Sequence, residues 1–272
     1  MNILITGSNG FIGSSLIKSL KGHSIFEGNR NTINLYSKSN IESFLIKNKI
    51  NVIIHCAIEG GNRLKEDNAD VLYKNILIFE NLMSFKDHYS TFINISSGAE
   101  FDRKNDIINY SECELFNNTP LDYYGLSKNL ISKLLLNFDR GLNLRIFGCF
   151  GETETNTRFI KSNTINYINK TPIIIHQDRY MDFIYIEDVC NVIQYSIDKR
   201  IRGDINLSYI KKLKLSDIAN MINNLSTYRV PIQTINNEIG LSYTGNGSKL
   251  DSFNLNLKGI ELGIKECYSK IV

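Results

Sequence analysis

Residues 2–13 read Asn2-Ile3-Leu4-Ile5-Thr6-Gly7-Ser8-Asn9-Gly10-Phe11-Ile12-Gly13, which is an apolar strand, a glycine turn and the start of a helix. Gly7 permits the tight turn, and Gly13 lets the helix pack closely on the strand. Gly10 lets backbone N–H groups approach a pyrophosphate at the positive end of the helix dipole. A tight turn without a cofactor is the alternative, but this context predicts a dinucleotide site. Its expected members are Gly7, Ser8, Asn9, Gly10, Phe11, Ile12 and Gly13.

The same alternation of strand and helix continues along the chain. Short apolar runs rich in β-branched residues alternate with amphipathic stretches through roughly the first 200 residues, which is typical of a parallel sheet covered by helices on both faces. The expected strands are 2–6, 23–27, 51–55, 91–95 and 143–148, and the expected helices are 11–21, 38–48, 68–87 and 122–138. The sequence therefore predicts an α/β fold with a doubly wound parallel sheet, the Rossmann fold.

The pattern changes toward the C-terminus. We expect strands at 171–176, 181–186, 204–207 and 229–235, and helices at 187–199, 216–225 and from about 258. This tail predicts a smaller, partly interleaved α/β substrate domain. The expected bounds are 1–152, completed by 182–202, for the dinucleotide-binding domain, and 153–181 with 203–272 for the substrate domain.

Composition limits the partners of the protein. The chain has 272 residues, is 42% hydrophobic and carries a formal charge of +3, which is too small to favour nucleic acid or a membrane surface. The first residues run directly into a strand, so cytoplasm is the expected compartment. Five scattered cysteines without a C-x-x-C pair indicate buried free thiols and no metal site.

The end of the second expected strand bears on the choice of cofactor. An acid at this point accepts hydrogen bonds from a free ribose 2′-hydroxyl and repels a 2′-phosphate. Here Asn29 and Arg30 follow the strand, and a guanidinium suits a 2′-phosphate, so NADP(H) is favoured over NAD(H). Glu27 is the counter-argument if the strand ends two residues earlier.

Tyr124 and Lys128 have the spacing that puts a phenol and an ammonium on one face of a helix. Such a pair can move a proton at neutral pH if the cation lowers the phenol pKa from its ordinary value of about 10 by roughly 2–3. Tyr195 and Lys199 have the same spacing, so only the context distinguishes the two pairs.

Together these motifs resemble the extended short-chain dehydrogenase/reductase superfamily of nucleotide-sugar enzymes, and the resemblance covers the whole chain. Besides the glycine turn and the Tyr-x-x-x-Lys pair, the matching stretches are Ile53-Ile54-His55-Cys56-Ala57, Ser96-Ser97-Gly98-Ala99, Leu144-Arg145-Ile146-Phe147-Gly148-Cys149-Phe150-Gly151 and Asp182-Phe183-Ile184-Tyr185-Ile186-Glu187-Asp188-Val189. Gly148 stands where the family usually has Asn. The segments around Arg30, Asn34 and Leu35 and from Ala57 to Gly61 most resemble GDP-fucose synthase and the sugar 4-ketoreductases.

The resemblance implies roles for particular residues. Ser97 would hydrogen-bond the substrate oxygen, Tyr124 would give or take its proton, and Lys128 would bind the nicotinamide ribose and keep the phenol acidic. Further cofactor contacts are expected at Asn34, Leu35, Cys56, Ala57, Ile58, Ile95 and Phe147, and substrate contacts at Ser97, Gly98, Arg158, Lys161 and Arg179. A nucleotide-sugar substrate and a homodimer formed through 68–87 and 122–138 are the implied partners.

The residues that are missing narrow the chemistry. Dehydratases of this superfamily have an Asp-Glu pair directly after the catalytic residue, where this chain has Gly98 and Ala99, so dehydration is disfavoured unless Glu100 takes that role. Ala99 and Arg158 also stand where GDP-fucose synthase has its Cys and His for epimerisation. We therefore expect NADP(H)-dependent reduction of a 4-keto (deoxy)sugar nucleotide. The alternatives are a nucleotide-sugar 4-epimerase with tightly bound NAD, another sugar-alcohol dehydrogenase, and a non-catalytic NADP-binding module.

The substrate side is less informative. The family has an Arg directly before Asp-Phe-Ile-Tyr to hold the diphosphate, whereas this chain has Met181 there and Arg179 two residues earlier. Arg158 and Lys161, one helical turn apart, are further candidates for phosphate contacts. The sequence does not indicate the base or the sugar.

Overall fold

A computed structural model describes residues 1–61 and 66–272 and contains a six-stranded sheet at the N-terminal side of the chain. Its strand order is β10-β6-β4-β3-β1-β2, and β1 pairs in parallel with both β2 and β3. The strands are β1 (Asn2–Thr6), β2 (Ser24–Gly28), β3 (Val52–His55), β4 (Thr91–Ser97), β6 (Gly141–Ile146) and β10 (Gly203–Leu207). This confirms the predicted doubly wound sheet.

The direction of winding changes at β1. β2 lies on one side of β1, and β3, β4 and β6 follow on the other side. In open α/β sheets, ligands bind outside the carboxyl ends of the strands at such a switch point. The glycine turn after β1 and the segment after β3 both lie at this edge, because β1 and β3 pair in parallel and in register from Ile3 with Val52 to Thr6 with His55.

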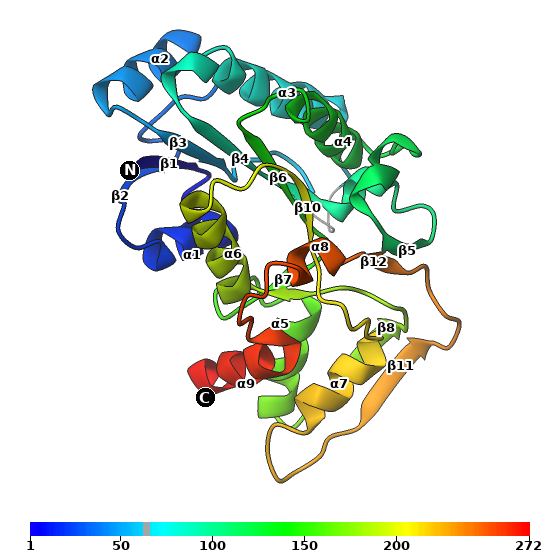
Figure 1. The fold of residues 1–272 in the computed structure, drawn as a ribbon. Helices are drawn as coiled ribbons and strands as arrows, with labels where there is room; N and C mark the ends of the chain where they lie inside the picture. The colour runs from blue at the N-terminus through cyan, green and yellow to red at the C-terminus, as the bar shows by residue number, and fades with distance from the viewer. Residues whose placement is uncertain (62–65) are drawn as a thin grey trace. The chain divides into compact units, whose positions relative to one another are not determined.

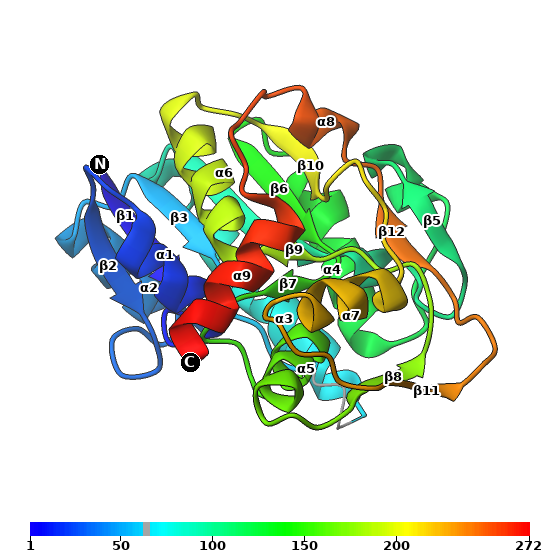
Figure 2. The same ribbon diagram turned by 90° about the horizontal axis from the view of Figure 1, so that it is seen from below.

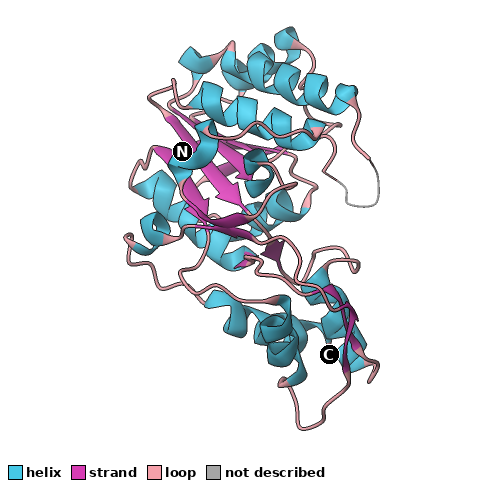
Figure 3. Cartoon of the chain, turned by 90° about the vertical axis from the view of Figure 1, so that its right-hand side faces the viewer, coloured by secondary structure: helices cyan, strands magenta, loops and turns pink. Residues whose placement is uncertain are grey.

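Helices cover both faces of the sheet (Figures 1 and 3). One face carries α2 (Lys38–Lys47), α3 (Ala69–Met83) and α4 (Tyr123–Leu135), and the other carries α1 (Phe11–Ser19) and the end of α6 (Ile186–Asp198). Apolar residues at helical spacing form the core on the first face, where Leu45, Leu82 and Ile131 of the helices pack with Ile53 and Phe92 of the strands.

The described chain divides into two compact units. Unit 1 contains residues 1–103, 112–145 and 193–205, and unit 2 contains 104–111, 146–192 and 206–272. Unit 2 has three short parallel pairs, β5 (Ile107–Tyr110) with β12 (Tyr243–Gly245), β7 (Cys149–Phe150) with β9 (Ile184–Tyr185), and β8 (Ile173–Gln177) with β11 (Ile232–Asn236). Its helices are α5 (Phe159–Ile168), α7 (Leu215–Asn223), α8 (Ser248–Asp251) and α9 (Gly259–Ile271), visible in Figure 2.

Several elements differ from the sequence-based expectation. The unpredicted strand β5 pairs with β12, which puts 104–111 in unit 2, and the division at 145/146 precedes the expected domain boundary at 152. The expected strand at 181–186 is reduced to β9, and the expected helices 68–87 and 122–138 end at Met83 and Leu135. Short 3₁₀ helices are found at η1 (Lys86–His88), η2 (Gly98–Phe101) and η3 (Glu112–Phe116). Within the described residues, we find no helix with the length and apolar character needed to span a membrane.

Candidate active site

The glycine turn after β1 has the geometry of a pyrophosphate site. Gly7 has φ +66°, and a Cβ there would lie 2.7 Å from the backbone nitrogen of Ala57, so only glycine fits. A Cβ on Gly13 would overlap the carbonyl oxygen of Gly7, which shows how closely α1 packs on the turn. Gly10 caps α1 without a side-chain hydrogen bond, so the first-turn N–H groups are the donors that a pyrophosphate needs. The turn therefore fits a dinucleotide.

The end of β2 has the residues that favour a phosphate. The strand includes Glu27, paired opposite Ile5, and ends at Gly28, so it does not stop early enough for Glu27 to read the ribose. Asn29 donates from Nδ2 to Ser8 Oγ at 3.2 Å, which ties the strand end to the glycine turn. The Arg30 side chain is 91% exposed and pairs with Glu59 at 3.2 Å.

The loop from β2 to α2 contains two other predicted cofactor residues. Asn34 accepts from the Tyr36 N–H through Oδ1 at 3.0 Å, and the Leu35 carbonyl accepts from Asn81 Nδ2 at 3.1 Å. Both residues therefore hold the loop in place. Ile58, beyond β3, is 36% exposed.

The end of β3 is fixed by a buried polar contact. His55 Nδ1 lies 2.8 Å from Thr6 Oγ1, and the same hydroxyl accepts from the Ala57 N–H at 3.2 Å. Burial, and secondly the charge of Lys128, lowers the pKa of His55 to about 3, so this ring is neutral. Asn75 fixes the segment after β3: its Oδ1 accepts from the Glu59 N–H at 2.8 Å, and its Nδ2 donates to the Glu59 carbonyl at 3.1 Å.

Ser97 ends β4 and begins η2. Its Oγ accepts from the Ala99 N–H at 3.2 Å, which fixes the serine at the turn. A Cβ on Gly125 of α4 would lie 2.6 Å from the Ala99 carbonyl oxygen, so the first turn of α4 packs directly on η2. Ser97 and Tyr124 are thus on two elements in close contact.

Tyr124 and Lys128 lie on successive turns of α4. The helix starts at the N-cap Asp122, whose Oδ1 accepts from the Gly125 N–H at 2.7 Å. Lys128 is 4% exposed and donates from Nζ to the Ile95 carbonyl at 2.6 Å, which ties α4 to β4. Burial lowers the pKa of Lys128 to about 8, although the nearby Cys56 opposes part of this shift.

Glu100 is bound inside the protein. It is fully buried, forms an ion pair with Arg145, and accepts from Ser96 Oγ at 2.8 Å and Ser132 Oγ at 2.6 Å. Arg145 also pairs with Asp204 at 2.7 Å. Because a buried charge that loses its partner costs several kcal/mol, this carboxylate is held in the core. The sequence could not give this result, since Ser132 and Arg145 lie far along the chain.

The predicted substrate contacts outside the β4 turn all belong to unit 2. Arg158 is exposed at the N-cap of α5, and Lys161 donates to the Glu152 carbonyl at 2.5 Å. Arg179 follows β8, and its Nε is buried without a hydrogen-bond partner. Phe147, a predicted cofactor contact, is also in unit 2 and packs on Tyr243 with ring centroids 5.3 Å apart.

Sequence reasoning missed two charged residues near these sites. Burial raises the pKa of Glu154 to about 8, while Arg158 and then Lys161 oppose this shift. In unit 1, the Arg103 guanidinium lies over the Tyr124 ring, 5.8 Å from its centroid. Neither residue belongs to a motif of the family, so only the folded chain shows them.

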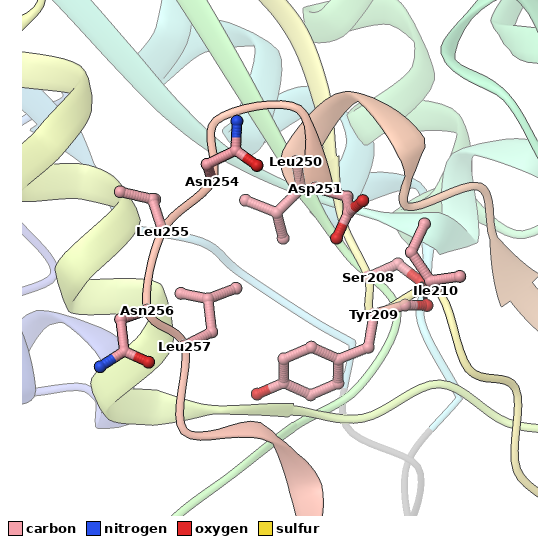
Figure 4. A pocket seen from close by; sticks show the side chains of 9 residues that line it. All are labelled: Ser208, Tyr209, Ile210, Leu250, Asp251, Asn254, Leu255, Asn256 and Leu257. Atoms are coloured by element: carbon pink, nitrogen blue, oxygen red, sulfur yellow. Dashed lines mark hydrogen bonds between the residues drawn. The ribbon is translucent and has the colours of Figure 1, made fainter.

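A pocket of about 580 Å³ opens in unit 2 between the start of the β10–α7 connection and residues 250–257 (Figure 4). Ser208, Tyr209 and Ile210 form one wall, and the Tyr209 hydroxyl is bonded to Asp188. None of Arg158, Lys161 and Arg179 lines this pocket.

The turn at β1, the order of the sheet and the Tyr124–Lys128 helix define a dinucleotide-binding protein of the short-chain dehydrogenase/reductase type. The chain belongs to the NAD dependent epimerase/dehydratase family, whose model matches residues 3–208. This confirms the resemblance found in the sequence.

Named relatives are nucleotide-sugar proteins. The CDP-abequose synthase of Yersinia pseudotuberculosis is 25% identical over 218 residues, covering 72% of this chain and 73% of the relative. The GDP-6-deoxy-D-talose 4-dehydrogenase of Aggregatibacter actinomycetemcomitans is 27% identical over 221 residues, covering 75% and 72%. Among solved structures, the GDP-mannoheptose C4 reductase of Campylobacter jejuni with NADP bound has a TM-score of 0.81 at 17% identity, covering 98% of this chain and 97% of that one.

Proposed function

We propose that this protein reduces the 4-keto group of a (deoxy)sugar nucleotide with NADPH. The observation that carries this proposal is the buried Glu100–Arg145 ion pair beside Gly98 and Ala99. Dehydration, and the C3 and C5 epimerisation carried out by GDP-fucose synthase, need a second acid or base next to Ser97, and the carboxylate of Glu100 in η2 is bound in the core. Tyr124 then remains as the proton donor, which supports a one-step carbonyl reduction.

The residues of the β4 turn and of α4 have separate roles in this reaction. When bound, NADPH supplies the hydride to the carbonyl carbon. Ser97 Oγ accepts from the Ala99 N–H, which orients the hydroxyl, and in this proposal the Ser97 hydroxyl hydrogen-bonds the carbonyl oxygen of the substrate. Tyr124 transfers its proton to the same oxygen. The buried ammonium of Lys128, held by the Ile95 carbonyl, favours the phenolate that remains.

The preference for NADP(H) rests on the end of β2. Arg30 is exposed and lies two residues after the strand end at Gly28, so its guanidinium can contact a 2′-phosphate. The NADP in the Campylobacter jejuni reductase supports the same choice. NAD(H) is the less favoured alternative.

The substrate class rests on the family and on three cations. The relatives carry CDP or GDP in their names, and we assign Arg158, Lys161 and Arg179 to the diphosphate of the substrate. Neither the base nor the sugar follows from these contacts.

The test is consumption of NADPH with a panel of 4-keto-6-deoxy nucleotide sugars, followed by analysis of the sugar products. We expect loss of NADPH and formation of the 4-hydroxy sugar in equal amounts. Interconversion of 4-epimers without net loss of cofactor would instead select the 4-epimerase. Binding of cofactor without turnover of any substrate would select a non-catalytic module.

A homodimer through α3 and α4 is part of the proposal. These helices leave large apolar side chains exposed, including Tyr73 at 65%, Leu130 at 37% and Leu134 at 48%. Sedimentation analysis tests the dimer: we expect the wild type to be dimeric and Leu134→Lys to be monomeric. A monomeric wild type would refute the proposal. We also place the protein in the cytoplasm, in keeping with its family.

A further inference from the structure

We propose that Arg103 is a second active-site cation, which acts with Lys128 to favour the ionised form of the Tyr124 phenol. The inference rests on the proposed role of Tyr124 as proton donor. It adds a residue that belongs to none of the family motifs in the sequence.

The position of Arg103 is fixed by the start of α4. Its guanidinium carbon lies 5.8 Å from the centroid of the Tyr124 ring, within the range of a cation–π contact. Its Nη2 donates to Asp122 Oδ1 at 3.0 Å, and the same oxygen caps the helix by accepting from the Gly125 N–H at 2.7 Å. One carboxylate therefore orients both the helix that carries Tyr124 and the cation beside it.

The backbone before Arg103 is unusual. Asp102 is buried and has φ 68°, a left-handed conformation that is costly for a residue with a Cβ. Its N–H bonds to the Ala99 carbonyl at 3.3 Å, so the chain leaves η2 at a defined point. A fixed turn reduces the range of positions open to the next side chain, Arg103.

The Tyr124 ring is also confined by glycine. A Cβ on Gly61 would lie 2.7 Å from the ring, so the backbone of this segment packs directly against the phenol. Gly61 has φ +72°, and its N–H is bound by both carboxylate oxygens of Asp67 at 3.1 Å. The ring therefore has little freedom to move away from Arg103.

In the described part of the chain, charged groups near Tyr124 come from three places. Its own helix contributes Lys128 and the cap Asp122, and the chain after η2 contributes Arg103. Asp67 accepts from the N–H of Gly61, which packs on the ring. Asp67 is bound to a backbone N–H, and Asp122 is shared between a backbone N–H and Arg103.

Two nearby titratable groups add no net charge beside the phenol. Glu100, in η2, is bound to Arg145 in the core, and the His55 ring near Lys128 is neutral because burial lowers its pKa to about 3. Among residues 1–61 and 66–272, Arg103 and Lys128 are the cations that we expect to act on the phenol, and Asp122 opposes Arg103. A cation at 4–6 Å stabilises an anion, and a guanidinium over a ring gains more when the ring becomes a phenolate.

The experiment follows the ionisation of Tyr124 directly. The ultraviolet difference spectrum between a protein and the same protein with Tyr124→Phe reports this phenol alone across a pH titration. We expect Arg103→Met to decrease the ionisation constant about threefold, because the Arg103 side chain is 39% exposed and is paired with Asp122, so its charge is partly screened. Arg103→Lys keeps the charge and is expected to restore most of the wild-type value.

Asp122→Asn is the matched variant of opposite sign. Asn keeps the oxygen that caps α4 but removes the negative charge that opposes Arg103, so the ionisation constant is expected to increase. A structural role of Arg103 would not give opposite shifts for Arg103→Met and Asp122→Asn. Equal ionisation in all variants overturns the proposal, as does a higher KM for the sugar nucleotide without any change in ionisation, because Arg103 would then bind substrate.

This titration needs no substrate, so it separates two kinds of failure. If no keto sugar is reduced but the phenol responds to Arg103 as expected, the proposed reaction is wrong and the electrostatic effect remains. If reduction is observed and the phenol does not respond, the reaction remains and the role of Arg103 is wrong.

Discussion

Replacing Lys128 by Met separates what this residue costs in stability from what it does in catalysis. Burial lowers the pKa of Lys128 from its ordinary value of 10.5 to about 8. Each pKa unit corresponds to about 1.4 kcal/mol, so the folded protein without cofactor loses about 3 kcal/mol when this amine is charged. The carbonyl of Ile95, which accepts from Lys128 at 2.6 Å, offsets part of any gain on substitution because it loses its donor.

The pH dependence gives the clearest form of this prediction. Below the folded-state pKa of about 8, the amine is charged in both states and its full cost is present. Between about 8 and 10.5 the unfolded chain holds a proton that the folded chain lacks, so stability rises with pH until both states are neutral. From pH 7 to 9.5, the wild type should gain about 2 kcal/mol relative to Lys128→Met.

Urea unfolding of the cofactor-free proteins at both pH values measures this difference. Lys133→Met, on the same helix, removes a charge that contacts Phe116 and serves as the control for the loss of a lysine from α4. Lys128→Met should also have little reductase activity. If its stability difference from the wild type is the same at pH 7 and 9.5, the buried amine is not penalised and the reasoning fails.

Three further substitutions test the site. Tyr124→Phe should lower turnover by at least about 100-fold with unchanged NADPH affinity, measured by steady-state kinetics and cofactor titration, and an unchanged rate would exclude the proton-donor role. Arg30→Ala should weaken NADPH binding about tenfold or more without changing NADH binding, because only the 2′-phosphate contact is lost, and equal effects on both cofactors would contradict it. Glu100→Gln should lower the free energy of unfolding by about 1–3 kcal/mol, since Arg145 stays charged and buried with Asp204 as its remaining carboxylate, and a neutral result in urea unfolding would show that the pair is not needed.

Local signals explain what could be predicted from the sequence. The strand, turn and helix from Asn2 to Ser19 are adjacent in the chain, so hydrophobic pattern and glycine spacing were sufficient. The pairing of β5 with β12 joins Ile107 to Tyr243 across half of the chain, and two short strands carry too little periodicity to reveal it.

Glu100 shows most clearly what could not be predicted from the sequence. In the sequence it is an acid three residues after Ser97, and nothing nearby predicts whether it faces the substrate or the core. Its partners Ser132 and Arg145 come from α4 and β6, and the fold alone brings them together. Motif reading therefore identified the residues that could react, while tertiary packing decided which of them are available.

The comparison with Tyr195 and Lys199 shows why spacing alone does not make a site. Lys199 lies beyond the end of α6 and is exposed, whereas Lys128 is buried within α4. The helix that carries Tyr124 also contains the buried amine of Lys128 and a glycine, Gly125. Each of them destabilises the folded protein by about 1 kcal/mol or more. Destabilising residues are retained where geometry matters for function, and here both of them lie in the helix that carries Tyr124. The distribution of unfavourable residues, rather than the five-letter motif, is the physical argument for Tyr124.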